Sequence, residues 1–244
     1  MLLVTSSSAL AEPRPGRLVL DGGEVDADVV VETSFDKQHI ADPVSIAPDL
    51  WWGVLPQLTI GVIHSDASVD QIQAAATLCV RHSDLFCGKT YRGSGVDIRW
   101  SALEGDFAIA PRVRLEVRDL DPWLPAVTLG ALARWTHGRF AITSDPYLRL
   151  GLANQARGNR AALFVPVWLS DQISYRVELA VHTGFDSELA VIRDGYHIPI
   201  ALLARVKVTA HFDAGIEGGF STLIGPQNDS SFRALLVTLG WRHY

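Results

Sequence analysis

The sequence predicts an all-β fold, an antiparallel up-and-down transmembrane β-barrel of about twelve strands, with ten or fourteen strands as the alternatives. Three observations predict this fold. Apolar and polar residues alternate with a period of two along most of the chain. The connections between the alternating segments are short and long in turn, and large aromatic residues gather near the short connections.

The alternation is clearest in residues 107–118, FAIAPRVRLEVR. With a period of two, Val113 and Leu115 share one face while Arg112 and Arg114 share the other. A soluble antiparallel sheet would show the same alternation, so this segment alone does not decide the architecture. The pattern recurs almost to the last residue, and no apolar run approaches the roughly 18 to 20 residues of a membrane helix. We therefore expect lipid outside the barrel and a charged interior, called the lumen below.

The N-terminal residues MLLVTSSSALAEP are similar to the end of a secretory signal peptide. We interpret residues 1–11 as the remnant of that signal, with cleavage after Ala11. Residues 12–26 are rich in Pro, Gly and acid and are interpreted as a periplasmic lead-in, with residues 18–20 as a candidate short strand. Residues 27–244 then form the barrel as one domain.

Twelve alternating segments follow in order, separated by clusters of turn-forming residues. Leu55-Pro56-Gln57 and His137-Gly138 are the tightest expected hairpin turns. The expected strands are residues 27–35, 46–54, 58–66, 91–103, 107–118, 125–136, 139–153, 161–169, 174–185, 197–207, 211–222 and 230–244.

Residues 67–90 interrupt the pattern and are expected to form the longest loop. Residues 68–76 could form a short helix with Ser68 as its N-cap. The chain has two cysteines, Cys79 and Cys87, and both lie in this loop. An exported chain with an even number of cysteines permits one local disulfide between them, and two free thiols are the alternative.

Loop lengths and aromatic residues orient the barrel. Short connections follow residues 54, 103, 136, 169 and 207, and outer-membrane barrels have short periplasmic turns with both termini on that side. Aromatic residues lie near this end on or near the apolar face, as an interfacial girdle would. They are Trp52, Trp100, Trp135, Tyr175 and Trp241. Trp168 has the opposite parity, which marks it as an exception or a β-bulge.

Two stretches carry a family resemblance. The segment APDLWWGVLPQLTIGVIHS looks like the hairpin that recurs in Gram-negative outer-membrane β-barrel proteins. The C-terminus LLVTLGWRHY is similar to the terminal-strand signal that the barrel assembly machinery recognises, although the last residue of that signal is usually Phe rather than Tyr244. The resemblance implies a porin-like or transporter-like barrel in the outer membrane, with the lipid bilayer and the assembly machinery as partners. It implies no particular member of the family.

The expected lumen is rich in arginine. A basic wall in a water-filled pore would favour a small anionic solute, so we predict a small diffusion channel or transporter-like pore. A non-conducting structural or surface-interaction barrel, its lumen filled by paired charges, is the alternative. The expected lumen-lining residues are Asp97, Arg99, Arg112, Arg114, Glu116, Arg118, Arg139, Asp145, Arg149, Arg176, Glu178, Arg205, Lys207, Asp213, Glu217 and Arg242.

Other classes of function find little support. A net charge of -6 and the lack of a basic patch argue against nucleic-acid binding. An outer-membrane lipid hydrolase would need a serine and a histidine in contact, yet His64 and Ser65 are neighbours in a strand and point to opposite faces. No catalytic residue, metal site or cofactor is therefore predicted. A soluble secreted β protein that binds a ligand would need a second layer to cover the apolar stripes, and no segment supplies one.

Overall fold

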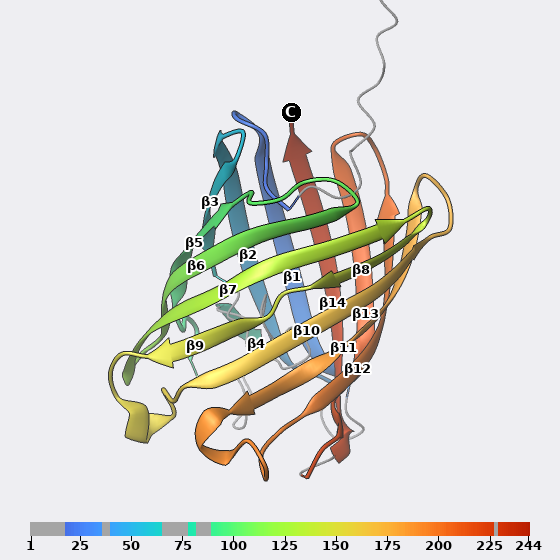
Figure 1. The fold of residues 1–244 in the computed structure, drawn as a ribbon. Coiled ribbons are helices and arrows are strands. Elements are labelled where there is room, and N and C mark those ends of the chain that lie inside the picture. The colour runs from blue at the N-terminus through green and yellow to red at the C-terminus, as the bar shows by residue number, and fades with distance from the viewer. Residues whose placement is uncertain (1–17, 36–39, 65–77, 82–88, 227–228) are drawn as a thin grey trace, which may run out of the picture.

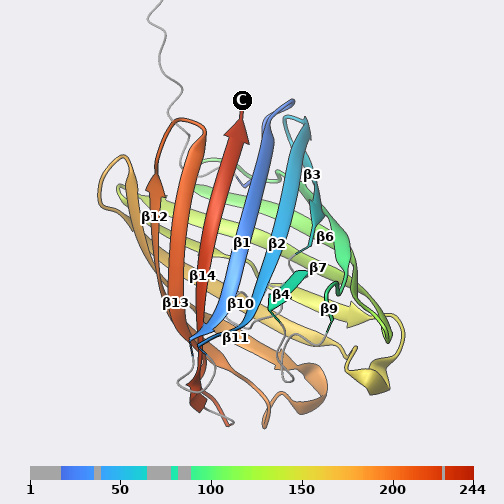
Figure 2. The same cartoon turned by 180° about the vertical axis from the view of Figure 1, so that it is seen from behind.

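The computed structural model describes residues 18–35, 40–64, 78–81, 89–226 and 229–244. Within them, fourteen strand segments form one antiparallel sheet, closed because β1 pairs with both β14 and β2. Figures 1 and 2 show the resulting barrel from its two sides. The segments are β1 (Val25–Phe35), β2 (Ile40–Leu55), β3 (Leu58–Ile63), β4 (Leu78–Arg81), β5 (Ser94–Trp100), β6 (Phe107–Leu120), β7 (Trp123–His137), β8 (Phe140–Ser144), β9 (Tyr147–Gly151), β10 (Ala162–Gln172), β11 (Val177–Glu188), β12 (Ile198–Lys207), β13 (Phe212–Ile224) and β14 (Asp229–His243).

Twelve strands span the barrel. The segments β8 and β9 are two halves of one strand, since both pair with β7 and β10. The short β4 pairs with β2 beyond the end of β3. The predicted twelve-stranded antiparallel barrel is thereby confirmed. Among the described residues, no helix is long and apolar enough to cross a membrane.

The predicted asymmetry of the connections is also present. The C-terminus and the short turn between β2 and β3 lie at the same end of the barrel in Figure 1. At the opposite end, two expectations were wrong. β2 begins at Ile40 rather than at residue 46, so the connection from β1 is shorter than expected. β6 continues to Leu120 and β7 begins at Trp123, so Asp121 and Pro122 alone connect them. The tight turn arises because the sheet pairing resumes at Leu120 and Trp123 after a register shift. The helix expected at residues 68–76 and the signal-peptide remnant lie outside the described residues.

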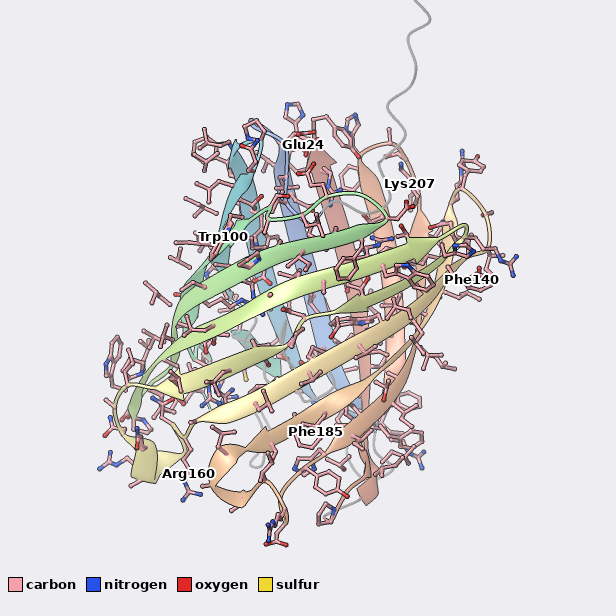
Figure 3. All side chains as sticks on the ribbon, in the orientation of Figure 1. Glu24, Trp100, Phe140, Arg160, Phe185 and Lys207 are labelled. Atoms are coloured by element: carbon pink, nitrogen blue, oxygen red, sulfur yellow. The ribbon has the colours of Figure 1, made fainter. Side chains whose placement is uncertain are left out.

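The outer face of the barrel is apolar. Leu115, Val181 and Leu202 lie in mid-strand and are exposed, as side chains must be when they face lipid and their neighbours face the lumen. The aromatic residues expected near the short turns are exposed as well, and Phe107, Phe140 and Phe212 extend this set at the starts of their strands. Figure 3 shows Trp100 and Phe140 projecting outward from the wall. The interfacial role of Trp52, Trp100, Trp135, Tyr175 and Trp241 stays a prediction.

The lead-in enters the mouth of the barrel, and the strand expected at residues 18–20 is wrong. Val19 and Leu20 are buried, and the backbone N–H of Leu20 donates a 2.7 Å hydrogen bond to Thr59 Oγ1 of β3. Gly53 of β2 exchanges backbone hydrogen bonds with Gly23 and Glu24. The lead-in lies against the inner face of β2 and β3 at the short-turn end. These contacts satisfy its backbone hydrogen-bonding groups, although it does not form a strand of the sheet.

Gly53 is the position where this packing tolerates no side chain. A Cβ there would lie 1.8 Å from the carbonyl oxygen of Asp21. We expect Gly53→Ala to lower the free energy of unfolding by about 1–3 kcal/mol, the usual effect of overpacking. Chemical denaturation of the refolded barrel in detergent micelles measures it. Gly215→Ala is the control, since the nearest atom to its Cβ is 3.7 Å away, and equal losses for the two variants would contradict the packing.

Candidate functional site

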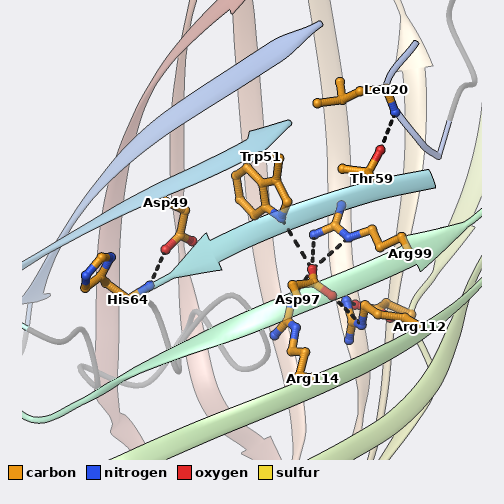
Figure 4. A network of polar contacts seen from close by, with 10 residues as sticks. Leu20, Asp49, Trp51, Thr59, His64, Asp97, Arg99, Arg112 and Arg114 are labelled. Carbon is orange, nitrogen blue, oxygen red and sulfur yellow. Dashed lines mark hydrogen bonds and ion pairs between the residues drawn. The ribbon is translucent and has the colours of Figure 1, made fainter. Parts of the chain in front are cut away.

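A cluster of charged side chains occupies the lumen around Asp97 of β5 (Figure 4). Its Oδ2 atom lies 2.6 Å from Arg99 Nη2 and 3.6 Å from Arg114 Nη2, and Trp51 Nε1 donates a 3.4 Å hydrogen bond to it. Arg112 Nε lies 4.0 Å from Oδ1. Asp97 is fully buried and Arg112 and Arg114 are 2% and 1% exposed. One carboxylate is thus surrounded by three guanidinium groups.

The register of the sheet brings these charges together. Asp97 pairs with Arg114 across β5 and β6, and Arg99 pairs with Arg112, so all four side chains leave the same face of neighbouring strands. Gly61 of β3 provides room, because a Cβ there would lie 2.2 Å from the Trp51 ring. The absence of a side chain lets the Trp51 indole reach Asp97.

The interruption between β8 and β9 supplies a second carboxylate. Asp145 lies in this gap and accepts a 2.5 Å hydrogen bond from Arg112 Nη1. The Arg112 guanidinium also lies over an aromatic ring, 5.5 Å from the centroid of Tyr147. Gly130 of β7 permits this arrangement, since a Cβ there would lie 2.5 Å from Tyr147 Cβ. Arg112 is therefore held by a carboxylate and a ring at once.

Aromatic rings form a second feature of the inner wall, one that sequence reasoning missed as a group. Tyr147 and Phe164 stack at 4.7 Å, and Arg149 lies 4.9 Å over the Phe164 ring. Trp168 stacks on His182 at 4.4 Å, and His182 Nδ1 lies 2.6 Å from Glu217 Oε1. The inward parity of Trp168 was the signal for these rings. A β-bulge at Trp168, one of the two predicted explanations of its parity, is wrong, because β10 pairs with β8 and β11 without a register shift.

Acidic residues are buried on three further strands of the barrel, β1, β2 and β13. Glu32 of β1, Asp49 of β2 and Glu217 of β13 are buried, and β13 stands opposite β6 in the strand order of the ring. Glu32 and Asp49 were not among the expected lumen residues. Each shares its strand face with an apolar residue two positions before it, Val30 or Ala47, so the alternation does not identify that face as polar. The lumen thus holds buried acidic side chains on other strands in addition to the arginine cluster.

The other expected lumen residues lie nearer the two ends. Glu116 is buried on β6, and Arg118 Nη1 donates a 3.4 Å hydrogen bond to the Gly158 carbonyl oxygen. Towards the short-turn end, ion pairs join Arg139 to Asp171, Arg205 to Asp213 and Arg242 to Asp26. Glu178 and Lys207 lie at strand ends, and Arg176 is exposed in the turn before β11. The cluster around Asp97 is therefore central, and Arg176 stands outside the barrel wall.

No catalytic or metal-binding arrangement was predicted. Within the described ranges, no three His, Cys, Asp or Glu side chains are placed to hold a metal ion. His64 Nδ1 lies 2.6 Å from the carbonyl oxygen of Pro48, and its neighbour Ser65 is outside the described residues. Cys79 is buried on β4, while Cys87 is outside them, so the disulfide stays a prediction.

Comparison with known proteins gives a fold and no sequence family. No family model matches the chain, and no curated protein matches it. Among solved structures, it is similar to the KdgM porin in complex with disordered oligogalacturonate, with a TM-score of 0.54, 9% identity, and coverage of 90% of this chain and 98% of that one. It is also similar to the NanC porin, with a TM-score of 0.56, 9% identity, and coverage of 89% and 98%. The chain therefore shares the fold of outer-membrane porins, which confirms the generic porin-like barrel.

Proposed function

We propose that the chain is a small diffusion channel in the outer membrane of a Gram-negative bacterium, and that it favours small anionic solutes. The observation that supports this best is the cluster of Arg99, Arg112 and Arg114 on the inner face of the barrel. Arg149 adds a fourth guanidinium group to the same wall. Guanidinium groups keep their charge at any physiological pH.

The lumen concentrates these charges in a narrow passage. Low-dielectric walls focus the field of a charged lining, which raises the local concentration of ions of the opposite sign. A twelve-stranded barrel is intermediate between a barrel filled by side chains and an open porin. The porin found with oligogalacturonate has the same fold and its ligand is an acidic oligosaccharide, which suits an anionic solute for this chain as well.

Planar-bilayer recordings of the refolded protein under a salt gradient test the channel. We expect discrete conductance steps and a reversal potential on the anion-selective side, and we expect Arg99→Gln to reduce the anion preference, since Arg99 is the least covered guanidinium around Asp97. Arg160→Gln is the control, because Arg160 pairs with Glu188 outside the lumen wall. A heat-shift on an unboiled gel establishes folding first. Cation selectivity of a folded barrel would contradict the proposal.

A non-conducting structural or surface-interaction barrel is the second candidate. The near-complete burial of Asp97, Arg112 and Arg114 favours it, because charges that pair and cover one another can fill a lumen. Silence from a barrel that passes the heat-shift control would support this candidate against the channel. Either role requires no catalysis, and we propose that the protein is not an enzyme.

The route to the membrane is part of the same proposal. Residues 1–11 would direct export, the barrel assembly machinery would insert the chain, and Cys79 and Cys87 would be oxidised after export. Thiol alkylation of the mature protein without reductant should then label neither cysteine, and full labelling would show that the disulfide does not form.

A further inference from the structure

A pocket of about 550 Å³ opens on the inner face of β7, β8, β10 and β11 near the short-turn end. Its volume falls in the range of small-molecule binding sites, about 300–1,000 Å³. It lies away from Asp97, which belongs to β5, and none of the charged residues around Asp97 lines it. The pocket is thus separate from the cluster that supports the channel.

Small side chains create the pocket. The register places Thr136 beside Ala141, and Ala141 beside Ser170, in one row across three strands. In the next row into the barrel, Thr143 pairs with Trp168 and Trp168 with His182, so the stacked rings of Trp168 and His182 stand below the hollow. Neither ring lines the pocket itself, whose wall is mostly polar.

Two opposite charges face this pocket and attract each other across it, but they form no direct ion pair. Arg134 of β7 and Glu178 of β11 both line it, and no ion pair within 4.0 Å joins them among the described residues. Arg134 Nε is buried and has no hydrogen-bond partner in the part of the chain that the structure describes. By contrast, Arg139 at the rim is already paired with Asp171 at 3.0 Å.

The strand order sets the distance between the two charges. β8 and β10 separate β7 from β11, and Arg134 lies in the row of Thr143, Trp168 and His182, four residues along β11 from Glu178. The backbones of Arg134 and Glu178 are therefore about 14 Å apart across the strands and about 13 Å apart along them. The wall is concave, and both long side chains converge on the pocket from its two sides. The remaining gap suits a small solute that carries a negative group towards Arg134 and a positive group towards Glu178.

We propose that this pocket is a binding site for a small zwitterion, with the carboxylate of the solute at the Arg134 guanidinium and its ammonium group at the Glu178 carboxylate. The half-buried Arg134 has one guanidinium N–H group, at Nε, without an acceptor among the described residues, and a guanidinium group gains from a carboxylate that supplies one. An anion alone would meet Arg134 but would also meet repulsion from Glu178, and a cation alone would meet the converse. The site goes beyond the proposed channel and does not require conduction.

Isothermal titration of the folded barrel in detergent micelles tests the site with three probes of equal length, 4-aminobutyrate, butyrate and butylammonium. We expect 4-aminobutyrate to bind more tightly than either singly charged probe. Arg134→Gln and Glu178→Gln should each weaken its binding by about tenfold or more, since each removes a charge-assisted hydrogen bond. Arg176→Gln is the matched control, because Arg176 is exposed in the adjacent turn and does not line the pocket.

Each other outcome overturns the proposal in a distinct way. Equal binding of butyrate and 4-aminobutyrate would show a plain anion site, and unchanged affinity in both variants would place binding elsewhere. No binding of 4-aminobutyrate to the folded barrel would refute the site. A heat-shift gel verifies that each variant is folded, and the two substitutions are independent, so one misfolded variant leaves the other to decide. Titration needs no current, so a silent barrel with intact binding would refute the channel alone.

Discussion

Replacement of Asp97 by Asn is expected to lower the free energy of unfolding by about 3–5 kcal/mol, the usual cost of removing one partner of a buried ion pair. Asp97 is fully buried between Arg99, Arg112 and Arg114. An amide keeps the shape of the side chain and removes its negative charge, so the repulsion among three guanidinium groups would lose the carboxylate they share. Asp145 pairs directly with Arg112 and so can offset only part of the lost charge.

Chemical denaturation of wild type and variant in the same micelles measures the loss. Asp26→Asn is the control, since Asp26 pairs with Arg242 near the mouth, where the arginine side chain is 42% exposed. An exposed pair is worth about 0–1 kcal/mol. If the channel conducts, Asp97→Asn should also shift its reversal potential further towards anions. Comparable losses for the two variants would show that Asp97 does not organise the cluster.

Leu115→Arg is expected to destabilise the inserted barrel by about 2–4 kcal/mol, because an arginine on the lipid face near the bilayer midplane loses its hydration. Leu115 lies within β6, far from both ends of that strand, and is 55% exposed. Its side chain points away from the lumen, since Arg114 and Glu116 on either side are buried. Val181→Arg on β11 should behave in the same way.

Leu120→Arg tests whether the effect of an arginine depends on its depth in the bilayer. Leu120 is the last residue of β6 and is also exposed, so the same substitution there should cost about 0–1 kcal/mol near the interface. Refolding into vesicles, followed by denaturant titration, compares the two variants. Equal tolerance at both positions would remove the assignment of this face to lipid.

The outer face of the barrel could be predicted because lipid imposes a strict rule on every second residue. Val113 and Leu115 follow that rule without exception, and the strand count followed from the recurrence of the pattern. Boundaries were less accurate at Asp121 and Pro122, where polar, turn-forming residues predict a longer loop than a closed sheet needs. The lead-in at Val19 and Leu20 was missed because its partners, Gly53 and Thr59, are distant in the sequence.

The contents of the lumen were harder to predict, since residues there pack against side chains from other strands. The arginines at 99, 112 and 114 were identified by parity, but their common partner depends on the register between β5 and β6. Asp145 reaches Arg112 only because the strand breaks between β8 and β9. Arg134 lies on the polar face of its strand, but only the folded wall shows that its Nε atom has no hydrogen-bond partner among the described residues.

The seam between β1 and β14 has a consequence for how the chain reaches its native state. Val25 pairs with His243, so the two strands that close the ring come from opposite ends of the polypeptide. Contacts between such distant residues form late, because a long loop must be ordered before they contribute. Until then both edges present unpaired backbone groups that can recruit other chains. We expect ring closure to limit the folding rate, and intermediates with open edges to need protection from aggregation on the way to the bilayer.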